Sequence, residues 1–318
     1  MPELWELQQK QQLPLDLKIL LTKQRITEWY DHHEGQVYVS FSGGKDSTVL
    51  LDIVRSMYPE VPAVFVDTGL EYPEIREHVK NTDNVTWLKP KMSFRKVIET
   101  YGYPVVSKEV AKRVSEYYNA EKKGRLQESR AYKEFMGVLK NHDGSPSAFN
   151  KIKWQSLTTA PFCISHKCCD VMKKVPIKEY EQITNKKPYD GTLATESRAR
   201  QTAWKKTGCN AFNGKRPISR PISFWNEDDV LEYILTYNIP IASVYGEIVR
   251  DEDGRLHTTG VERTGCIFCM FGCHLEKHPN RFQRLKMTHP KLYEYCMKPW
   301  DEGGLGISRV LDYIGVDY

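Results

Sequence analysis

A short turn near the start of the chain has the residue types that hold a phosphate group: Ser42, Gly43, Gly44, Lys45, Asp46 and Ser47. Paired glycines allow a tight turn whose backbone N–H groups converge on an anion at the start of a helix. Lys45 adds a positive charge that we expect to face the ligand, and the serines add hydroxyl donors. Asp46 is a candidate for organising Mg²⁺, although a carboxylate at the start of a helix also serves as a cap.

Four cysteines in two groups form a second set of residues that could do chemistry: Cys168, Cys169, Cys266 and Cys269. Four thiolates are enough to hold Zn²⁺ or a [4Fe–4S] cluster. Adjacent cysteines are awkward for a structural zinc site, which normally takes two separated pairs, but the residues alone leave both the cluster and zinc open. Cys163 and Cys273 lie close enough in sequence to replace one of these ligands. Cys209 and Cys296 are isolated, and we interpret each as an ordinary thiol.

An alternation of strands and helices must position the phosphate turn. We predict strands at residues 36–41, 62–67 and 85–88, and helices at residues 48–57 and 74–80. Such an alternation implies a parallel sheet with right-handed crossovers, in which ligands sit at the carboxyl ends of the strands. The phosphate turn follows the first strand, and Asp67, Thr68 and Gly69 follow the second. Both segments therefore fall at the edge of the sheet where ligands bind.

Helical segments are expected around this core. Residues 14–33 read as a leading helix with Leu17, Leu20 and Leu21 on one face. Further along, we predict a helical arm at residues 107–140, a strand at residues 189–194 and an amphipathic helix at residues 225–237. The predicted domains are a helical segment at residues 1–34, an α/β domain at residues 35–255 with an insertion at residues 107–155, and a cysteine-bearing helical region at residues 256–318.

The composition is that of a folded protein whose charge is unevenly placed. Of its 318 residues, 40% are apolar and 27% are charged, and the net charge is +5. Residues 105–155 contain 11 Lys and Arg against 6 Asp and Glu, and residues 196–220 contain 7 against 1. Unless they are ordinary solvated faces, these stretches indicate polyphosphate or nucleic acid as a partner, and we expect them to form one basic surface beside the phosphate turn. Aromatic residues in and beside the two stretches either stack on bases or pack in the core: Tyr117, Tyr118, Tyr132, Trp154 and Trp204.

The sequence gives no sign of a membrane or secreted protein. No apolar run approaches the roughly 20 residues that span a bilayer, and residues 1–12 lack the pattern of a signal peptide. Eight cysteines are too sparse for a disulfide scaffold in a chain of this length. We therefore expect a cytoplasmic protein without a membrane partner.

The segments SFSGGKDSTVLL and FVDTGLEYPEI, which contain the phosphate turn and Asp67, resemble the ATP pyrophosphatase superfamily with the PP-loop. Within it they are similar to the branch of the phosphoadenosine phosphosulfate reductases and the ATP sulfurylase small subunit. The resemblance implies an adenine nucleotide α-hydrolase-like α/β fold, a parallel twisted sheet flanked by helices with helical N-terminal and C-terminal additions. It also implies that the turn holds the pyrophosphate portion of Mg²⁺-ATP and that Asp67, Thr68 and Gly69 lie close to the adenosine.

Two further segments extend this resemblance. The cysteine arrangement resembles the CC…CxxC pattern that ligates a [4Fe–4S] cluster in bacterial adenylylsulfate reductases. The segment GTLATESRAR, residues 191–200, matches the position of an arginine-bearing substrate loop in that family. Arg198 and Arg200 are therefore implied phosphate ligands, and Arg198 is implied to act in catalysis with Lys45 and Asp46. The alternative is that the two arginines only pair with Glu196 or with surface acids.

Two departures from the reductases decide the predicted function. The Glu-Cys-Gly-Leu/Ile-His ending is missing, while Lys45, Asp46 and Ser47, at positions that are typically degraded in reductases, are all present. We therefore expect an enzyme that uses ATP to adenylate an acceptor, with release of pyrophosphate, in a sulfur-transfer pathway such as DNA phosphorothioation. Nucleic acid is the expected acceptor, a cysteine desulfurase is an expected kind of sulfur donor, and the sequence is compatible with a homo-oligomer. The alternatives are a sulfonucleotide reductase with Cys296 or Cys209 as its thiol, and a non-catalytic sensor of nucleotide and cluster.

Overall fold

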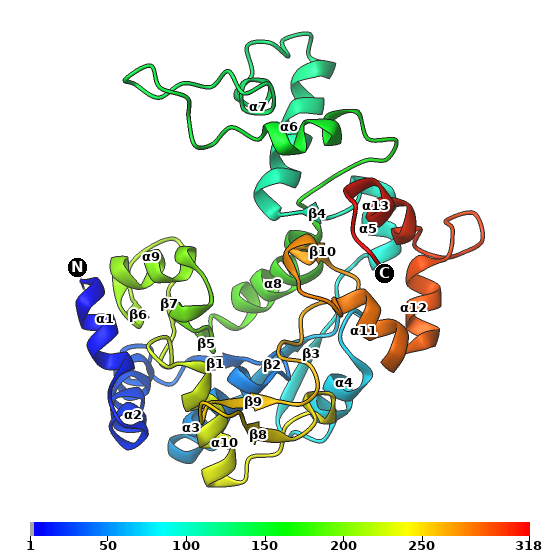
Figure 1. The fold of residues 1–318 in the computed structure, drawn as a ribbon. Coiled ribbons are helices and arrows are strands. Elements are labelled where there is room, and N and C mark those ends of the chain that lie inside the picture. The colour runs from blue at the N-terminus through cyan, green and yellow to red at the C-terminus, as the bar shows by residue number, and fades with distance from the viewer. Residues whose placement is uncertain (1–2) are drawn as a thin grey trace. The chain divides into compact units, whose positions relative to one another are not determined.

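The structure is a computed structural model that describes residues 3–318 and has a mixed α/β fold (Figure 1). Its main sheet has six strands in the order β3-β2-β1-β5-β7-β6. These strands are β1 (Val37–Ser40), β2 (Ala63–Val66), β3 (Val85–Leu88), β5 (Lys187–Asp190), β6 (Asn210–Ala211) and β7 (Ile218–Ser219). Neighbouring strands are parallel except β6 and β7, which are antiparallel. The predicted fold class, a parallel sheet flanked by helices, is confirmed.

The chain forms two compact units that alternate along the sequence. The first contains the main sheet and comprises the residues up to Asp67, Glu71–Lys89 and Pro176–Gly265. The second comprises Thr68–Leu70, Pro90–Val175 and Cys266–Tyr318. The three domains expected from the sequence, the first of which starts with two residues outside the described range, stay a prediction.

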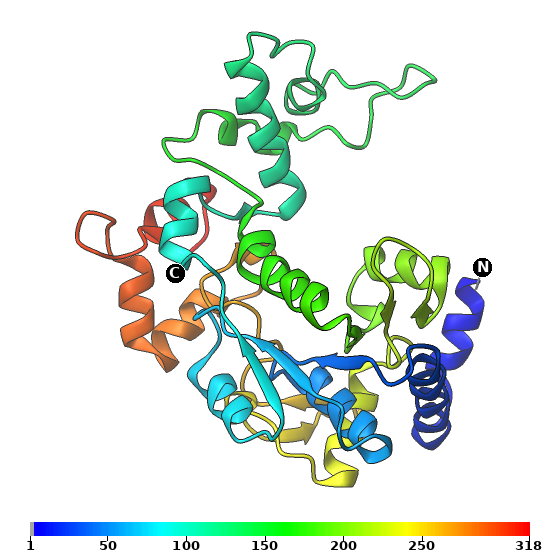
Figure 2. The same ribbon diagram turned by 180° about the vertical axis from the view of Figure 1, so that it is seen from behind.

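Most helices of the first unit pack against the sheet or against one another. They are α1 (Leu4–Gln11), α2 (Leu15–His32), α3 (Lys45–Met57), α4 (Pro73–Lys80), α8 (Val175–Thr184), α9 (Arg198–Thr207) and α10 (Glu227–Tyr237). The unit also contains the short helices η3 (Ala194–Glu196) and η4 (Ser243–Tyr245) and the hairpin of β8 (Ile248–Arg250) and β9 (Leu256–Thr258). Figure 2, seen from behind, shows α8 leading into β5.

Side-chain alternation along β1 decides which helix covers which face of the sheet. The Tyr38 hydroxyl donates to the carboxylate of Glu181 in α8 at 2.7 Å. The next residue, Val39, pairs in register with Tyr189 of β5, whose hydroxyl donates to the Ile26 carbonyl of α2 at 2.8 Å. Successive residues of a strand point to opposite faces of the sheet. The helices α8 and α2 therefore lie on opposite faces.

The buried face of α2 differs from the leucine face expected from the sequence. Leu17 and Leu20 are 43% and 64% exposed, whereas Lys18 is buried. The Lys18 ammonium contacts both carboxylate oxygens of Asp229 in α10, at 2.6 and 2.7 Å, and donates to the Gln11 carbonyl at 2.8 Å. The face of α2 that is buried therefore carries Lys18, paired with a residue 211 positions away, and not the leucines that the apolar pattern predicted.

The second unit is mainly helical. Its elements are α5 (Phe94–Tyr101), β4 (Val105–Val106), α6 (Lys108–Lys122), α7 (Arg130–Phe135), η1 (Ile152–Thr159), the π-helical η2 (Asp170–Lys174), β10 (Met270–Phe271), η5 (Cys273–Leu275), α11 (Arg281–Thr288), α12 (Pro290–Met297) and α13 (Ile307–Ile314). β4 and β10 pair in parallel. The helical arm expected at residues 107–140 is present as α6 and α7.

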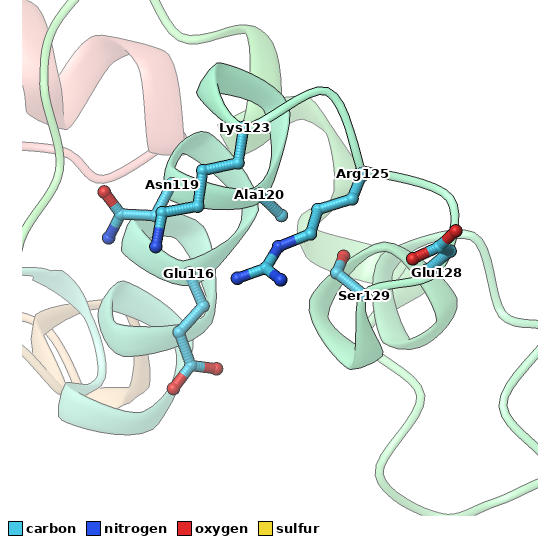
Figure 3. A pocket seen from close by; sticks show the side chains of 7 residues that line it. All are labelled: Glu116, Asn119, Ala120, Lys123, Arg125, Glu128 and Ser129. Carbon is cyan, nitrogen blue, oxygen red and sulfur yellow. The ribbon is translucent and has the colours of Figure 1, made fainter.

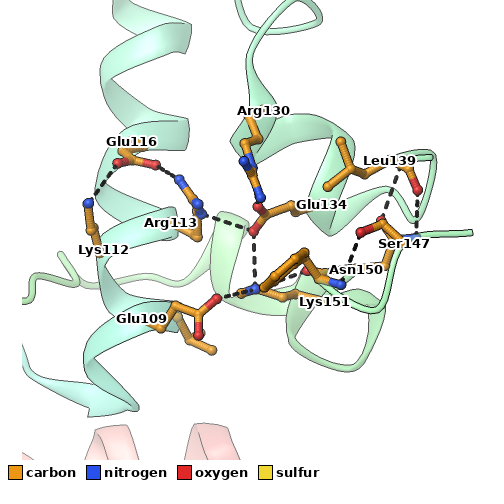
Figure 4. Close-up of polar contacts among 12 residues, drawn as sticks. Glu109, Lys112, Arg113, Glu116, Arg130, Glu134, Leu139, Ser147, Asn150 and Lys151 are labelled. Carbon is orange, nitrogen blue, oxygen red and sulfur yellow. Dashed lines mark hydrogen bonds and ion pairs between the residues drawn. The ribbon is translucent and has the colours of Figure 1, made fainter. Parts of the chain in front are cut away.

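A buried carboxylate organises this arm (Figure 4). Glu134 of α7 is fully buried, and its oxygens lie 2.8 Å from Arg130 Nε, 3.0 Å from Arg113 Nε and 3.1 Å from Lys151 Nζ. Burial opposes the charge of Glu134, but the surrounding cations outweigh this effect and lower its pKa. Lys151 also pairs with Glu109 of α6 at 2.8 Å. The arm therefore has a polar centre of its own, which joins α6, α7 and the residue before η1.

One predicted helix and one predicted strand differ from the structure by three residues or more at one end. Helix α3 begins at Lys45, inside the phosphate turn, rather than at residue 48. The strand expected at residues 189–194 is β5, which ends at Asp190 because Gly191 packs closely against the phosphate turn and Ala194 begins η3. Among residues 3–318, no helix combines the length and the apolar character that crossing a membrane requires.

Candidate functional site

The phosphate turn lies where the strand order of the main sheet reverses. The chain runs from β1 to β2 and β3 in one direction and from β5 to β7 and β6 in the other. Such a reversal opens a crevice at the carboxyl ends of the two central strands. Residues 42–47 follow β1, and Gly191 follows β5. A Cβ atom on Gly191 would lie 3.2 Å from the carbonyl oxygen of Asp46 and from the nitrogen of Ser47, so the backbone after β5 packs directly against the turn.

Gly43 gives the turn its sharp bend. Its φ of +72° lies in the left-handed region that favours glycine. A Cβ atom at this position would lie 2.7 Å from Val79 Cγ2, so no larger residue fits. The Ser47 hydroxyl closes the turn by accepting the Ser42 N–H at 3.2 Å and donating to the Gly44 carbonyl at 2.9 Å. The predicted order of strand, turn and helix is confirmed.

Lys45, which we expected to face the ligand, is buried by contacts within the protein. Its side chain is 4% exposed, and its ammonium lies 2.8 Å from the Glu227 carboxylate of α10 and donates to the Glu262 carbonyl at 2.6 Å. Its backbone N–H donates to the Tyr245 hydroxyl at 3.0 Å, and that hydroxyl contacts the Thr264 hydroxyl at 2.8 Å. Burial lowers the pKa of Lys45, but the neighbouring carboxylates outweigh it, so the pKa is raised.

Asp46 is the acidic residue of the turn, and its Oδ1 atom is buried without a hydrogen-bond partner among the described residues. Burial is the main cause that raises its pKa from 3.8 to about 6. The charges of Glu196 and Glu227 raise it further, while Lys45 and Arg263 oppose the shift. Oδ1 caps no backbone N–H. A carboxylate oxygen in this position has the chemistry of a Mg²⁺ ligand.

The residues expected near the adenosine are divided between the two units. Asp67 belongs to the first unit, where its carboxylate is buried and pairs with Arg76 of α4 at 2.8 Å. The next residues, Thr68 to Leu70, belong to the second unit. There the Leu70 carbonyl accepts the Ile267 N–H at 2.8 Å. The structure therefore connects Leu70, the residue after this predicted segment, with the residues between Cys266 and Cys269.

Arg198 and Arg200 both lie in the first turn of α9. Arg200 forms an ion pair with Glu196, which also contacts Arg263 at 3.1 Å. This is the pairing that the sequence left open as the alternative for Arg200. Arg198 is exposed and forms no ion pair with any residue that the structure describes. A role for Arg198 as phosphate ligand and catalytic residue stays a prediction.

The four cysteines expected to bind a cluster all belong to the second unit. Cys168 and Cys169 begin a helix that continues as the π-helical η2, and π-helical turns occur frequently at functional sites. In the other group, the Cys269 N–H donates to the Cys266 carbonyl at 3.0 Å. Burial raises the pKa of the Cys168 thiol, and the three other cysteines raise it further. Burial and Cys266 raise the pKa of Cys269 to about 12. The four sulfur atoms are therefore close enough to interact electrostatically.

The chemistry of these donors fits an iron–sulfur cluster. Four thiolates complete its coordination, and the positive charge of iron would relieve the repulsion that raises their pKa values. Arg281 supports one ligand turn, because its Nη1 donates to the Cys269 carbonyl at 2.8 Å and its guanidinium pairs with Glu276. Among residues 3–318, no three Cys, His, Asp or Glu side chains have the spacing of ligands around one metal ion. The second unit thus gathers the donors without forming a closed site.

The remaining cysteines are in different environments. Cys163 is exposed, whereas Cys273 is buried and donates to the Met270 carbonyl at 3.1 Å. Cys209 and Cys296 are buried, and burial raises the pKa of both thiols. Their burial agrees with our interpretation of both as ordinary thiols.

The two basic stretches fall in different units, residues 105–155 in the second and residues 196–220 in the first. Lys122, Lys123 and Arg125 are exposed and form no ion pair within the described part of the chain. Lys123 and Arg125 line a hollow of about 400 Å³ at the end of α6 (Figure 3). Tyr117 and Trp204 are only 8% and 3% exposed, so both pack in the protein interior rather than on a basic surface.

Sequence reasoning missed the groups that surround Lys45, namely Glu227, Tyr245, Glu262 and Thr264. The acids at the start of α10 stabilise the helix by complementing its dipole. Because this local role accounts for their presence, the sequence gives no reason to expect a contact with Lys45. Glu262 acts through its backbone carbonyl, for which residue type carries no signal.

A parallel sheet with a glycine-rich phosphate turn at the reversal of its strand order defines a class of phosphate-binding α/β proteins. The family model of the phosphoadenosine phosphosulfate reductase domain matches residues 36–136 and 125–272 of this chain. The chain belongs to this family, as the resemblance of its motifs predicted.

Individual proteins that resemble this chain share between 13% and 25% sequence identity with it. The adenosine 5′-phosphosulfate reductase of Anoxybacillus flavithermus is 21% identical over 295 residues, which cover 92% of this chain and 98% of that protein. Two uncharacterized proteins of Methanocaldococcus jannaschii are 22% and 25% identical over 274 and 280 residues, and this chain spans only 42% and 49% of their lengths. The crystal structure of a phosphoadenylyl-sulfate reductase from Candida auris in complex with phosphate is 13% identical, with a TM-score of 0.40, and the match covers 73% of this chain and 89% of that one.

Proposed function

We propose that this chain is a nucleotide-binding enzyme that uses ATP to adenylate an acceptor in a sulfur-transfer pathway. The observation that carries the proposal is the complete phosphate turn at the reversal of the strand order. Gly43 has the required left-handed conformation, and Lys45 and Asp46 are both present at the start of α3. A reductase that binds a ready-made sulfonucleotide has no pyrophosphate to release and needs no such lysine and aspartate.

In the proposed reaction, an acceptor oxygen forms a bond to the α-phosphorus of ATP. The bond from this phosphorus to the α,β-bridging oxygen breaks, and pyrophosphate leaves with the bonding electrons. N–H groups at the start of α3 and the ammonium of Lys45 would stabilise the leaving pyrophosphate. The Asp46 carboxylate would bind the Mg²⁺ that accompanies the nucleotide. A sulfur nucleophile then displaces AMP from the acceptor.

We assign the cysteine pair Cys168 and Cys169 and the turn from Cys266 to Cys269 to a [4Fe–4S] cluster. The mutual influence of the four thiols supports this assignment. Such a cluster would supply either sulfur relay or a structural link within the second unit. Protein purified without oxygen should contain about four iron atoms per chain and absorb broadly near 400 nm. Colourless protein with one zinc ion would contradict the cluster, but it would still agree with the four cysteines as metal ligands.

Nucleic acid is the acceptor that we propose. The exposed cations Lys122, Lys123 and Arg125 support it, because none of them forms an ion pair with a carboxylate of the described chain. Each phosphate that they neutralise releases about 0.9 counterion from duplex DNA, so binding should weaken steeply with salt. Fluorescence anisotropy of short DNA and RNA across a salt series measures this, and changing the three residues together to Ala should reduce the slope. Weak, salt-independent binding that the triple change leaves unaltered would favour a small anionic acceptor.

A sulfonucleotide reductase is the second candidate, and the Anoxybacillus flavithermus relative, an adenosine 5′-phosphosulfate reductase by name, favours it. A reductase of this kind needs an accessible thiol. Cys209 and Cys296, which we considered for that role, are both buried. Release of sulfite from adenylyl sulfate in the presence of thioredoxin would support this candidate over the adenylating enzyme.

The direct test of the proposed function is pyrophosphate release from Mg²⁺-ATP, with DNA, tRNA and sulfate offered in turn. Lys45→Ala should lower the rate on the order of 10²-fold or more, because it removes a cation from the leaving pyrophosphate. Lys80→Ala, at an exposed residue of α4, is the matched control and should leave the rate unchanged. Equal rates for wild type and Lys45→Ala would show that the phosphate turn is not the ATP site.

A further inference from the structure

The phosphate turn in this structure is already occupied by groups of the protein itself. The Glu227 carboxylate and the Glu262 carbonyl contact the Lys45 ammonium at 2.8 and 2.6 Å. The Tyr245 hydroxyl accepts the Lys45 backbone N–H at 3.0 Å. These are the oxygen acceptors that a bound polyphosphate would supply to the same donors. A polyphosphate can therefore reach the Lys45 ammonium only where the Glu227 and Glu262 oxygens give way.

We propose that the segment of residues 262–264 and the Glu227 carboxylate gate the phosphate turn, and that a nucleoside triphosphate binds by displacing them. We refer to residues 262–264 as the strap. This inference rests on the proposed function, because it takes the turn to be the ATP site. It goes beyond that function in assigning Glu227 and the strap as built-in competitors of the nucleotide.

The strap has a fixed base. The Gly260 N–H donates to the Tyr245 carbonyl at 2.8 Å, and the Val261 N–H donates to the Val244 carbonyl at 3.1 Å. A Cβ atom on Gly260 would lie 2.3 Å from the Val244 carbonyl oxygen, so the two backbones are in direct contact. The Thr258 hydroxyl donates to the Val261 carbonyl at 3.0 Å. The residues just before the strap are therefore anchored to η4.

The strap itself is held only by polar contacts. Glu262 and Arg263 are exposed, and Thr264 is only partly buried, so the strap buries no large apolar side chain. Its contacts are the Glu262 carbonyl on Lys45, the Arg263 guanidinium on Glu196 at 3.1 Å, and the Thr264 hydroxyl on Tyr245 at 2.8 Å. Segments with few buried apolar contacts open at low free energy. The strap can therefore leave the turn while its base stays in place.

Glu227 is the part of the gate that a substitution can remove without disturbing the turn. Its side chain is 48% exposed, so its pair with Lys45 is partly solvated. Pairs of this kind contribute about 0.2–1 kcal/mol, which corresponds to a change in affinity of up to about fivefold when the competitor is removed. Removing the negative charge beside the triphosphate also lowers repulsion. Glu227→Gln should therefore tighten nucleotide binding by about three- to tenfold.

The test measures the Kd of α,β-methylene-ATP with Mg²⁺ by isothermal titration calorimetry, for wild type, Glu227→Gln and Glu232→Gln. Glu232 lies on the same helix, is exposed and makes no ion pair with the described residues, so its variant controls for net charge. The gate predicts tighter binding for Glu227→Gln and an unchanged Kd for Glu232→Gln. Equal or weaker binding of Glu227→Gln, with normal wild-type binding, would overturn the gate and leave the ATP site intact. Absence of binding in all three proteins would instead refute the proposed function.

Hydrogen exchange provides a readout that does not depend on Glu227. The amides of residues 262–265 donate no backbone hydrogen bond within the described chain, so their exchange should stay fast after the same nucleotide is added, because the strap leaves the turn. Amide exchange of Gly260 and Val261 should stay slow, because their hydrogen bonds belong to the anchored base. Nucleotide-dependent protection of residues 262–265 would show that the strap closes over the ligand instead and would overturn the proposal.

Discussion

The unpaired oxygen of Asp46 should make the stability of the protein depend on pH in a way that one substitution removes. Burial raises the pKa of Asp46 from 3.8 to about 6, so the folded protein binds this proton more tightly than the unfolded chain does. The associated stability is fully present below pH 3.8 and is lost as the pH rises through about 6. We therefore expect Asp46→Asn, which carries no charge, to be more stable than wild type at pH 7.5.

The size of the effect follows from the shift. A pKa difference of one unit corresponds to about 1.4 kcal/mol, so a shift from 3.8 to about 6 corresponds to about 3 kcal/mol at neutral pH. The side chain keeps part of its surface exposed, so the measured gain should lie between about 1 and 3 kcal/mol. Toward pH 4, where wild-type Asp46 is protonated, the difference between the two proteins should shrink.

The assay is urea unfolding followed by tryptophan fluorescence at pH 4.5, 6.0 and 7.5. The control is Asp253→Asn, at an exposed residue of the turn between β8 and β9, which should change the free energy of unfolding little at any pH. The reasoning would be refuted if Asp46→Asn were less stable than wild type at pH 7.5. It would be refuted equally by a stability difference that stays constant between pH 4.5 and pH 7.5.

Three further substitutions test other parts of the structure. Lys18→Met leaves the Asp229 carboxylate without its cation and should cost about 3–5 kcal/mol of unfolding free energy, measured in urea. Glu134→Gln takes the charge from the centre of the arm and should speed its cleavage in limited proteolysis, whereas an unchanged rate would contradict the role of this network. Gly43→Ala forces a Cβ to within 2.7 Å of Val79 and should abolish nucleotide binding in calorimetry while leaving the circular dichroism helical.

The parts of the fold that the sequence predicted are those with local causes. Apolar runs at residues 36–41 and 62–67 mark β1 and β2, and the glycines between strand and helix mark the phosphate turn. These patterns depend on a few adjacent residues and on the geometry of a tight turn. The ends of helices and strands are harder to predict, because they depend on packing between distant segments. The close approach of Gly191 to Ser47, just after the end of β5, is an example.

Long-range pairings are what the sequence could not predict. Lys18 faces the interior because Asp229 lies 211 residues further along the chain, and no periodicity of α2 could show this. The same holds for Lys45, whose partners Glu227 and Glu262 come from separate later segments. A residue type indicates which contacts a side chain is able to make, whereas topology decides which of them form.

The ion pair between Lys18 and Asp229 ties the N-terminal helix α2 to the start of α10. The Asp229 carboxylate also accepts the Asn226 N–H at 2.6 Å, and the Asn226 side chain donates to the Gln11 carbonyl at 3.1 Å. The start of α10, from which Glu227 reaches Lys45, is thus braced from outside by residues that precede the sheet. A protein shortened to start at residue 35 would keep every strand and the whole phosphate turn. It would nevertheless leave a buried carboxylate without its cation beneath the site, so anyone trimming this protein for crystallisation should keep α1 and α2.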